Sequence, residues 1–388
     1  MIYLDNASTT QVSPDLKQLI DKYLYDNYGN ASSIYRFGVE SERAIDVARE
    51  QIATAFSTTQ ENIIFTSGGS EANTLAIIGL ANHLQSLHLN HIITTKYEHH
   101  SVLNAMKEME WRGFEVTYLD VPNGLVQYND FVAAVREDTG FVSIMYVNNE
   151  LGTKNDIKPI YEFCKSREII FHSDCVQAVG TEDIKLGKTA DMISISGHKI
   201  HAPKGIGCLC TLYKDFLSNI IFGGQQEFGI RPGTESVSDI AAFGEAIQAL
   251  TENKERFTTH IDTVSLAFGG RLLQLSNELG FKFECNASTP FRSSKILSIR
   301  FKNIDAETLV IMLGTRGVCV SAGSACNSRS TEPSHVLKAI GLTDEEARST
   351  IRISFSEYTK LDEAYEAAEI IAECVSTLIN LDGLDEYQ

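Results

Sequence analysis

The sequence lacks the features of an exported, membrane-spanning or nucleic-acid-binding chain. Its start, MIYLDNASTT, has no basic patch followed by an apolar core, and no apolar run reaches the ~18 residues that a membrane helix needs. Basic residues are few, because 33 Lys and Arg stand against 51 Asp and Glu, a net charge of −18. So acidic a chain is a poor partner for a phosphate backbone, and we expect no direct contact with nucleic acid or a membrane.

The eight cysteines include no C-x-x-C pair, which argues against a zinc ribbon or a dithiol redox motif. In a long chain without an export signal, scattered cysteines indicate reduced thiols and a cytoplasmic location. Cys208 and Cys210 alternate along an apolar run and are most simply strand residues. Cys326 differs, because its stretch VSAGSACNS has no bulky apolar neighbour that would bury a thiol. We expect Cys326 on a solvent-reachable loop.

Short apolar runs alternate with amphipathic stretches over most of the chain. The runs typical of strands are NIIF, HIIT, FVSIMYV, IIFH, MISIS and GCLCTL, whereas SERAIDVAREQIATAF has helical spacing. This alternation predicts an α/β fold, with a mainly parallel sheet covered by helices on both faces. The pattern changes after Thr251. We therefore expect a large domain over residues 1–251 and a smaller C-terminal α+β domain over 252–388, with residues 1–15 free to pack against the smaller one and a ligand cleft between the two.

Two motifs place reactive groups directly after predicted strands. Lys199 in SISGHKI can reach into a cleft and form a Schiff base with an aldehyde cofactor, with a surface lysine as the alternative. In FTSGGSEAN a strand leads into a helix expected from Glu71. Its first backbone N–H groups and the Ser70 hydroxyl can bind a phosphate, with a plain glycine turn capped by serine as the alternative.

Two further motifs supply the rest of a cofactor site. Asp174 in HSDCVQA ends a strand, where a carboxylate can pair with a protonated pyridine nitrogen and Gln177 can reach a ring oxygen; the alternative is an aspartate that caps the next segment. One of His99 and His100 can stack on a flat ring and move protons, whereas adjacent histidines on an extended segment point to opposite sides and make a poor metal pair. Together these groups describe a pyridoxal phosphate site.

The chain resembles the cysteine desulfurases of the NifS/IscS type, which have the class V aminotransferase fold, an aspartate aminotransferase-like fold of pyridoxal phosphate (PLP)-dependent transferases. The resemblance rests on motifs in matching order through nearly the whole chain: YLDNASTT, YGNASS, FTSGGSEAN, EHHSVL, VNNELG, HSDCVQAVG, SISGHKIHAPKGIG, RPGTES, SAGSACNS, EPSHVLKAIG and STIRIS. It implies a homodimeric enzyme that converts L-cysteine to L-alanine and leaves a persulfide on Cys326. The sulfur would pass to an acceptor protein in iron–sulfur cluster assembly or in tRNA or cofactor thiolation.

The resemblance also implies a role for each matching residue. The catalytic residues would be Cys326, Lys199 and His99. The cofactor would be bound by Gly69, Ser70, Asn149, Asp174, Gln177, Ser196, His198 and Lys199, with Thr234 reaching across from the second subunit. The substrate would be bound by Arg352, Asn30 and Asn149, although Arg352 could instead face outward from a strand and Asn30 form a turn. No intrinsic metal site is implied, but Cys326 could transiently ligate an iron–sulfur cluster.

Several positions depart from the pattern that is usual in this family. Ala31 stands in place of a proline, Tyr35 of a histidine, Gln225 of a glycine, and Ser356-Glu357 of a small, often basic pair. Three alternative functions stay open from the sequence. A selenocysteine lyase shares almost every site residue, a class V aminotransferase needs no thiol loop, and a non-catalytic binding protein could retain the same fold.

Overall fold

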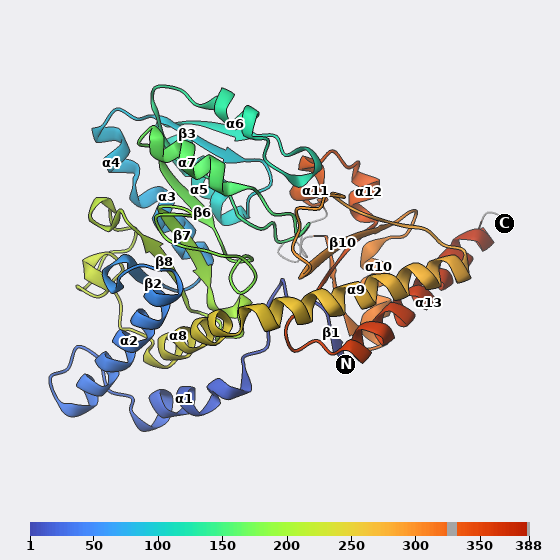
Figure 1. The fold of residues 1–388 in the computed structure, drawn as a ribbon, viewed down its shortest axis with the longest axis horizontal. Helices are drawn as coiled ribbons and strands as arrows, with labels where there is room; N and C mark the ends of the chain where they lie inside the picture. The colour runs from blue at the N-terminus through green and yellow to red at the C-terminus, as the bar shows by residue number, and fades with distance from the viewer. Residues whose placement is uncertain (324–331, 386–388) are drawn as a thin grey trace.

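The computed structural model describes residues 1–323 and 332–385. A seven-stranded sheet lies at the centre of its larger part (Figure 1). The strands are β2 (Ile63–Thr66), β3 (His91–Thr95), β4 (Glu115–Leu119), β5 (Thr139–Ser143), β6 (Ile170–Asp174), β7 (Met192–Ser196) and β8 (Gly207–Thr211). Their order is β2-β8-β7-β6-β5-β3-β4; β8 is antiparallel to both neighbours and the other pairings are parallel.

Helices cover both faces of this sheet, as the sequence predicted. Ile93 and Ile193 pack into one apolar core with α2, α6, α7 and α8, whereas their neighbours Ile92 and Met192 pack into a second core with α3, α4 and α5. The helices are α1 (Lys17–Asp21), α2 (Arg36–Ala55), α3 (Gly69–Gly79), α4 (Ala81–Ser86), α5 (His100–Trp111), α6 (Tyr128–Ala134), α7 (Ile157–Ser166) and α8 (Val237–Glu252). Strands buried on both faces are apolar at successive positions, which explains runs such as MISIS.

Short helical turns connect these elements. The 3₁₀ turns are η1 (Pro14–Leu16), η3 (Gln60–Asn62), η4 (Pro122–Gly124), η5 (Gly197–Lys199), η6 (Lys214–Phe216) and η7 (Glu227–Gly229), and η2 (Lys22–Asp26) is a π-helical turn. Among the residues that the structure describes, no helix is both long and apolar enough to cross a bilayer.

The smaller part is built on an antiparallel sheet of order β12-β13-β10-β9. Its strands are β9 (Phe283–Cys285), β10 (Ile296–Phe301), β12 (Ser321–Ala322) and β13 (Thr350–Ser354), and a separate parallel pair joins β1 (Ile2–Tyr3) to β11 (Val318–Cys319). The helices are α9 (Lys254–Leu279), α10 (Ala306–Thr315), α11 (His335–Ala339), α12 (Asp344–Arg348) and α13 (Leu361–Asp385). The long helices α9 and α13 pack side by side (Figure 1).

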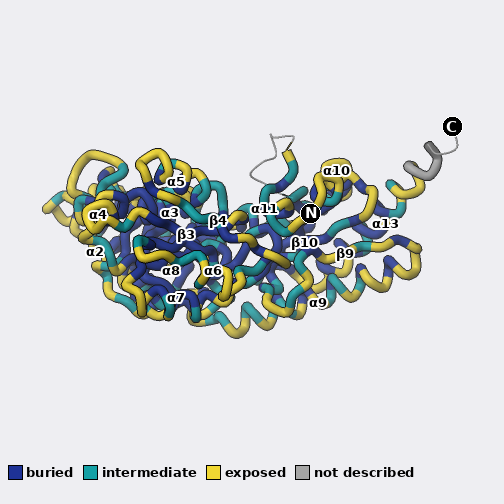
Figure 2. Tube along the Cα trace, turned by 90° about the horizontal axis from the view of Figure 1, so that it is seen from above, coloured by how far each residue is buried: buried dark blue, intermediate teal, exposed yellow. Residues whose placement is uncertain are grey.

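The buried residues fill the interior of both parts, and exposed residues lie on the outside (Figure 2). The smaller part has its own core, which includes Ile2 and Leu4 from the start of the chain. Helix α8 ends at Glu252 and α9 begins at Lys254. We keep the division into domains of residues 1–251 and 252–388 as a proposal.

Candidate active site

Most of the predicted site residues line one cavity of about 610 Å³. They are Gly69, Ser70, His99, Asn149, Asp174, Gln177, Ser196, His198, Lys199 and Arg352. All but Arg352 follow strands of the large sheet or end them, whereas Arg352 comes from β13 of the smaller part. The carboxyl ends of parallel strands are the usual ligand edge of such a sheet, and this explains why residues far apart in the sequence meet here.

Two of the predicted residues that the structure describes, Asn30 and Thr234, do not line this cavity. Asn30 is exposed, and its Oδ1 accepts a hydrogen bond from the backbone N–H of Ser32 at 2.9 Å, which is the turn-forming alternative. Thr234 is exposed, and its expected contact with a second subunit stays a prediction. Cys326 lies outside the described residues.

Lys199 ends the turn η5 directly after β7. Its Nζ donates hydrogen bonds to the backbone oxygens of Ala7 and Ser8, each at 2.6 Å. Its own carbonyl oxygen accepts a hydrogen bond at 3.3 Å from Nζ of Lys295, which comes from the smaller part. The amine thus lies at the cavity wall and is held there by the first residues of the chain.

Asp174 is the last residue of β6 and is buried. Its Oδ1 accepts from the backbone N–H of Val176 at 3.0 Å, which is the capping contact, while its Oδ2 accepts from Nδ2 of Asn73 at 2.7 Å. Gln177 donates from Nε2 to the Ala7 oxygen at 3.0 Å, and its buried Oε1 has no partner within the described part of the chain. The cavity therefore contains both a held carboxylate and an unused acceptor.

Helix α3 begins at Gly69, two residues before the predicted start at Glu71. Gly68 caps it with a φ of 152°, a conformation that L side chains rarely adopt. A Cβ on Gly69 would lie 2.8 Å from Cγ2 of Val176, so only glycine lets the helix start approach Val176 this closely, while Gly69 and Ser70 both line the cavity. A helix N-terminus that lines a cavity presents backbone N–H groups that suit an anionic group.

His198 lines the same cavity as this helix start. Burial, aided by the charges of Lys199 and Lys204, lowers the pKa of His198 to about 4, so its ring is neutral at neutral pH. Its Nδ1 is 3.2 Å from the hydroxyl of Thr9. A neutral imidazole can donate one hydrogen bond to an anion without a strong charge that would hold the anion permanently.

Three histidines lie together on another part of the wall. His99 caps α5, His100 is its first residue, and His335 begins α11; all three line the cavity. The expectation that His99 and His100 point to opposite sides assumed an extended segment, whereas here they start a helix. The ring centres of His100 and His335 are 4.4 Å apart, and within the described residues no group of three or more metal-ligating side chains forms.

Arg352 lies in the middle of β13 and is buried, which excludes the outward-facing alternative. Its Nη2 donates to Oδ1 of Asp5 at 2.9 Å and to the hydroxyl of Ser8 at 2.6 Å, and its Nη1 donates to the Asn149 oxygen at 2.9 Å. Its buried Nε has no partner among the described residues. A fixed guanidinium with an unused N–H at a cavity suits a carboxylate ligand.

Two buried acids near the cavity were not predicted from the sequence. Burial raises the pKa of Glu98 to about 8 and that of Glu150 to about 7. Glu150 accepts a hydrogen bond at 2.5 Å from the hydroxyl of Ser334, which caps α11. Glu150 directly follows Asn149 in the motif VNNELG, and this neighbourhood could have indicated that Glu150 lies at the site. Asn73 and His335, in the quoted motifs FTSGGSEAN and EPSHVLKAIG, were also missed.

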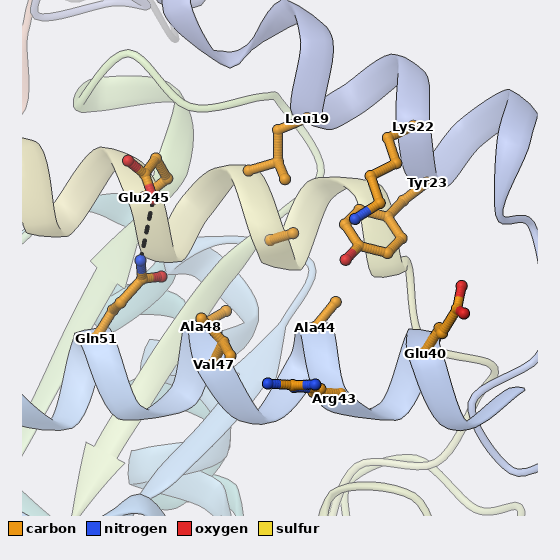
Figure 3. Close-up of a pocket in the computed structure, with 11 residues that line it drawn as sticks. Leu19, Lys22, Tyr23, Glu40, Arg43, Ala44, Val47, Ala48, Gln51 and Glu245 are labelled. Atoms are coloured by element: carbon orange, nitrogen blue, oxygen red, sulfur yellow. Dashed lines mark hydrogen bonds between the residues drawn. The ribbon is translucent and has the colours of Figure 1, made fainter. Parts of the chain in front are cut away.

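A second hollow, of about 440 Å³, lies between α1, α2 and α8 (Figure 3). Leu19, Tyr23 and Val47 line it together with charged side chains, and Nε2 of Gln51 donates to Glu245 across it at 3.0 Å. It contains none of the predicted site residues. The chemistry therefore belongs to the cavity at the strand ends.

Comparison with known proteins agrees with this arrangement. A family model described as "Aminotransferase class-V" matches residues 2–365, so the chain belongs to the class V aminotransferases. Within that family it groups with the cysteine desulfurases of the IscS type, as the sequence predicted. It is 40% identical to the cysteine desulfurase IscS of Pectobacterium carotovorum subsp. carotovorum (strain PC1), and the match covers 99% of this chain and 95% of that protein.

Solved structures support the same fold. A structure described as a NifS-like protein superposes with a TM-score of 0.89 at 30% identity, covering 97% of this chain and 100% of that one. Another, described as SspA in complex with cysteine, has a TM-score of 0.79 at 34% identity and covers 93% of this chain and 100% of that one. The predicted α/β fold of the PLP-dependent transferases is confirmed.

Proposed function

We propose that this chain, a cysteine desulfurase by family, converts L-cysteine to L-alanine and takes up the sulfur as a persulfide on Cys326. The observation that carries the proposal is the convergence of Lys199, Asp174, His99 and Arg352 on one cavity. The reaction breaks the Cβ–S bond of the substrate and forms an S–S bond to Cys326, while the proton of the Cys326 thiol is balanced by the new C–H bond of alanine. No external oxidant or reductant is needed.

Pyridoxal phosphate is the cofactor of this proposal, and the cavity residues fit it. The fit rests on the Lys199 amine, the Asp174 carboxylate, the unused Oε1 of Gln177 and the helix start at Gly69 and Ser70 that lines the cavity. The residues that would hold it are Gly69, Ser70, His99, Asn149, Asp174, Gln177, Ser196, His198 and Lys199, with Thr234 of a second subunit. When bound, this cofactor supplies an electron sink that makes the α-proton of the substrate acidic and weakens its Cβ–S bond.

The remaining tasks fall to the side chains of the chain itself. Arg352 would bind and orient the substrate carboxylate, because Asp5 and Ser8 already fix its guanidinium in a buried position. His99 would hold a proton at its ring, since burial lowers the pKa of His99 and keeps the imidazole neutral at neutral pH. Cys326 would supply the attacking sulfur as a thiolate.

The relatives argue against the alternative functions. The full-length relative described above is named a cysteine desulfurase, so a selenocysteine lyase and a class V aminotransferase are not favoured. The same similarity argues against a non-catalytic binding protein, as does the presence of Lys199, Asp174 and His99 in one cavity. We infer that the enzyme is a homodimer and that it works in the cytoplasm, where thiols stay reduced. We also infer that it passes sulfur to an acceptor protein of iron–sulfur assembly or of tRNA or cofactor thiolation.

The test measures alanine and bound sulfur in the purified enzyme supplied with pyridoxal phosphate and ³⁵S-cysteine. Wild type is expected to form one alanine for each sulfur released and to retain label on Cys326. Lys199→Ala is expected to abolish alanine formation, and Cys326→Ala to abolish the bound label. The exposed thiol of Cys285 provides a matched control, since Cys285→Ala removes a reachable sulfur without touching the cavity.

Two results would contradict the proposal. Label retained in full by Cys326→Ala would place the persulfide elsewhere. Turnover of selenocysteine by Cys326→Ala, together with no turnover of cysteine by wild type, would favour a selenocysteine lyase.

A further inference from the structure

The hydrogen bonds around His99 determine which of its ring nitrogens carries the proton. His99 caps α5, and its Nδ1 accepts a hydrogen bond at 3.2 Å from the backbone N–H of Ser101. A backbone N–H can only donate, so Nδ1 must offer a lone pair. In a neutral imidazole one nitrogen carries hydrogen and the other a lone pair. The proton of neutral His99 therefore sits on Nε2.

The side chain of Ser101 also favours the lone pair on Nδ1 of His99. Its hydroxyl lies 2.8 Å from Nδ1 of His99 and accepts a hydrogen bond at 2.9 Å from Nδ2 of Asn73. Because Nδ2 can only donate, the hydroxyl oxygen is the acceptor in that contact and its own hydrogen is available for Nδ1. Nδ1 is thus met by two donors, the backbone N–H and the hydroxyl of Ser101.

The orientation of Asn73 is set by Asp174. The second hydrogen of Nδ2 goes to Oδ2 of Asp174 at 2.7 Å. If the amide were turned over, its oxygen would face the carboxylate oxygen at that distance, and two acceptors would repel each other. The chain of contacts therefore has one direction, from the Asn73 amide to the Asp174 carboxylate on one side and through the Ser101 hydroxyl to His99 on the other.

We propose that Ser101 and Asn73 are positioning residues that hold His99 as the Nε2–H tautomer and keep it in register with Asp174. The inference deepens the proposed function, in which Asp174 pairs with the cofactor ring and His99 covers it. The ring of His99 then offers a hydrogen-bond donor at Nε2 rather than a base. Residues from α3, α5 and β6 share this task, so the tautomer is built into the packing of three elements around the cavity.

The experiment reads the tautomer directly in protein labelled with ¹⁵N-histidine, without cofactor or substrate. Long-range proton–nitrogen spectra distinguish a nitrogen that carries hydrogen from one with a lone pair, and His99→Gln assigns the signals by their loss. Wild type is expected to show the lone pair at Nδ1 and hydrogen at Nε2. Ser101→Ala keeps the backbone N–H at 3.2 Å but loses the hydroxyl at 2.8 Å, so the preference is weakened and a minor signal of the opposite tautomer is expected. Ser101→Thr, which keeps the hydroxyl, should match wild type.

The same variants are assayed for desulfuration. Loss of one hydrogen bond predicts a fall in kcat/KM of about fivefold for Ser101→Ala, and Ser101→Thr is expected to stay within about twofold of wild type. Thr74→Ala is the matched control, because it removes a hydroxyl from the residue next to Asn73, and this hydroxyl donates within α3 to the Ser70 oxygen at 2.8 Å. It should leave the His99 signals unchanged.

Hydrogen on Nδ1 in wild type would overturn the inference, as would a Ser101→Ala variant with unchanged His99 signals. The spectra do not depend on turnover. An Nε2–H signal in a protein that forms no alanine would therefore contradict the proposed function and leave the tautomer standing.

Discussion

At the scale of single residues, buried acids near the cavity are the least expected feature. Glu98 is wholly buried; its Oε1 accepts from the Met145 backbone N–H at 2.9 Å and from the Thr95 hydroxyl at 2.8 Å, and its Oε2 has no partner in the described part of the chain. Burial dominates over these two donors and raises the pKa of Glu98 to about 8. The group is therefore protonated in the folded protein at neutral pH.

This shift predicts a stability that falls as pH rises. The unfolded chain releases the Glu98 proton near its ordinary pKa of about 4.3, whereas the folded chain keeps it to about pH 8. Folding thus binds a proton between these values, and raising the pH favours the unfolded state. Glu98→Gln should flatten the decline of Tm over this range in scanning calorimetry. Glu108→Gln, at a half-buried carboxylate paired with Arg112, serves as the control and should keep the wild-type decline.

Single residues also mark the limit of sequence interpretation. Lys199 and Asp174 could be predicted because each directly follows or ends an apolar strand. Asn73 and Asp5 could not, because they act through partners that lie 101 and 347 residues away, on Asp174 and Arg352. Hydrogen-bond partners at such separations leave no local pattern, and only the folded chain brings them together.

At the scale of elements, the start of α3 is the most constrained. Gly68 has a φ of 152°, and the nearest atom that a Cβ would meet is Oγ of Ser196 at 3.8 Å, so the obstacle to a side chain is backbone strain and not space. Gly68→Ala should therefore lower the free energy of unfolding by roughly 1–3 kcal/mol. It should also weaken binding of the cofactor phosphate, because the helix N–H groups shift.

The measurement combines urea unfolding with titration of pyridoxal phosphate by absorbance. Gly113→Ala is the matched control, since Gly113 also has a positive φ, of 93°, with open space around its Cβ position and no place in the cavity. Both variants should lose stability, and only Gly68→Ala should lose affinity. Equal affinity in the two would show that the helix start does not hold the phosphate.

Some helices and strands can be predicted from their sequence more readily than others. Strands buried on both faces, such as β7, are continuous apolar runs and could be predicted. β4, at the edge of the sheet, was missed because EVTYL has exposed and half-buried positions that give no such run. The strand predicted over FVSIMYV ends at Ser143, and Met145 and Val147 beyond it line the cavity.

At the scale of the whole molecule, a buried polar cluster joins the two parts behind Lys199. His201 Nε2 lies 3.0 Å from Oε2 of Glu357, and the buried Lys295 is close enough for the Glu357 carboxylate to act on its charge. Burial lowers the pKa of Lys295, and the negative charge of Glu357 offsets part of this effect by raising it. Glu357 departs from the residue that is usual in the family at this position. Its negative charge stabilises the positive charge of the buried Lys295.

Breaking this cluster should leave an unpaired charge. Glu357→Ala is expected to lower the free energy of unfolding by about 3 kcal/mol, and adding Lys295→Met should recover most of the loss because no buried ammonium remains. Urea unfolding monitored by fluorescence checks both. Asp344→Ala removes the carboxylate of an exposed pair with Lys338 and should change nothing measurable. A double variant as unstable as Glu357→Ala alone would contradict the account.

The placement of the first residues has a consequence for how the enzyme is made. Ile2 pairs with Val318 in β1 and β11, Asp5 holds Arg352, and the Ala7 and Ser8 oxygens hold Lys199. On the ribosome these first residues emerge long before their partners, and they cannot take up their places until the C-terminal lobe has left the exit tunnel. A nascent chain that has completed only its large sheet therefore still lacks a finished catalytic centre, because Arg352 and Val318 have yet to be added.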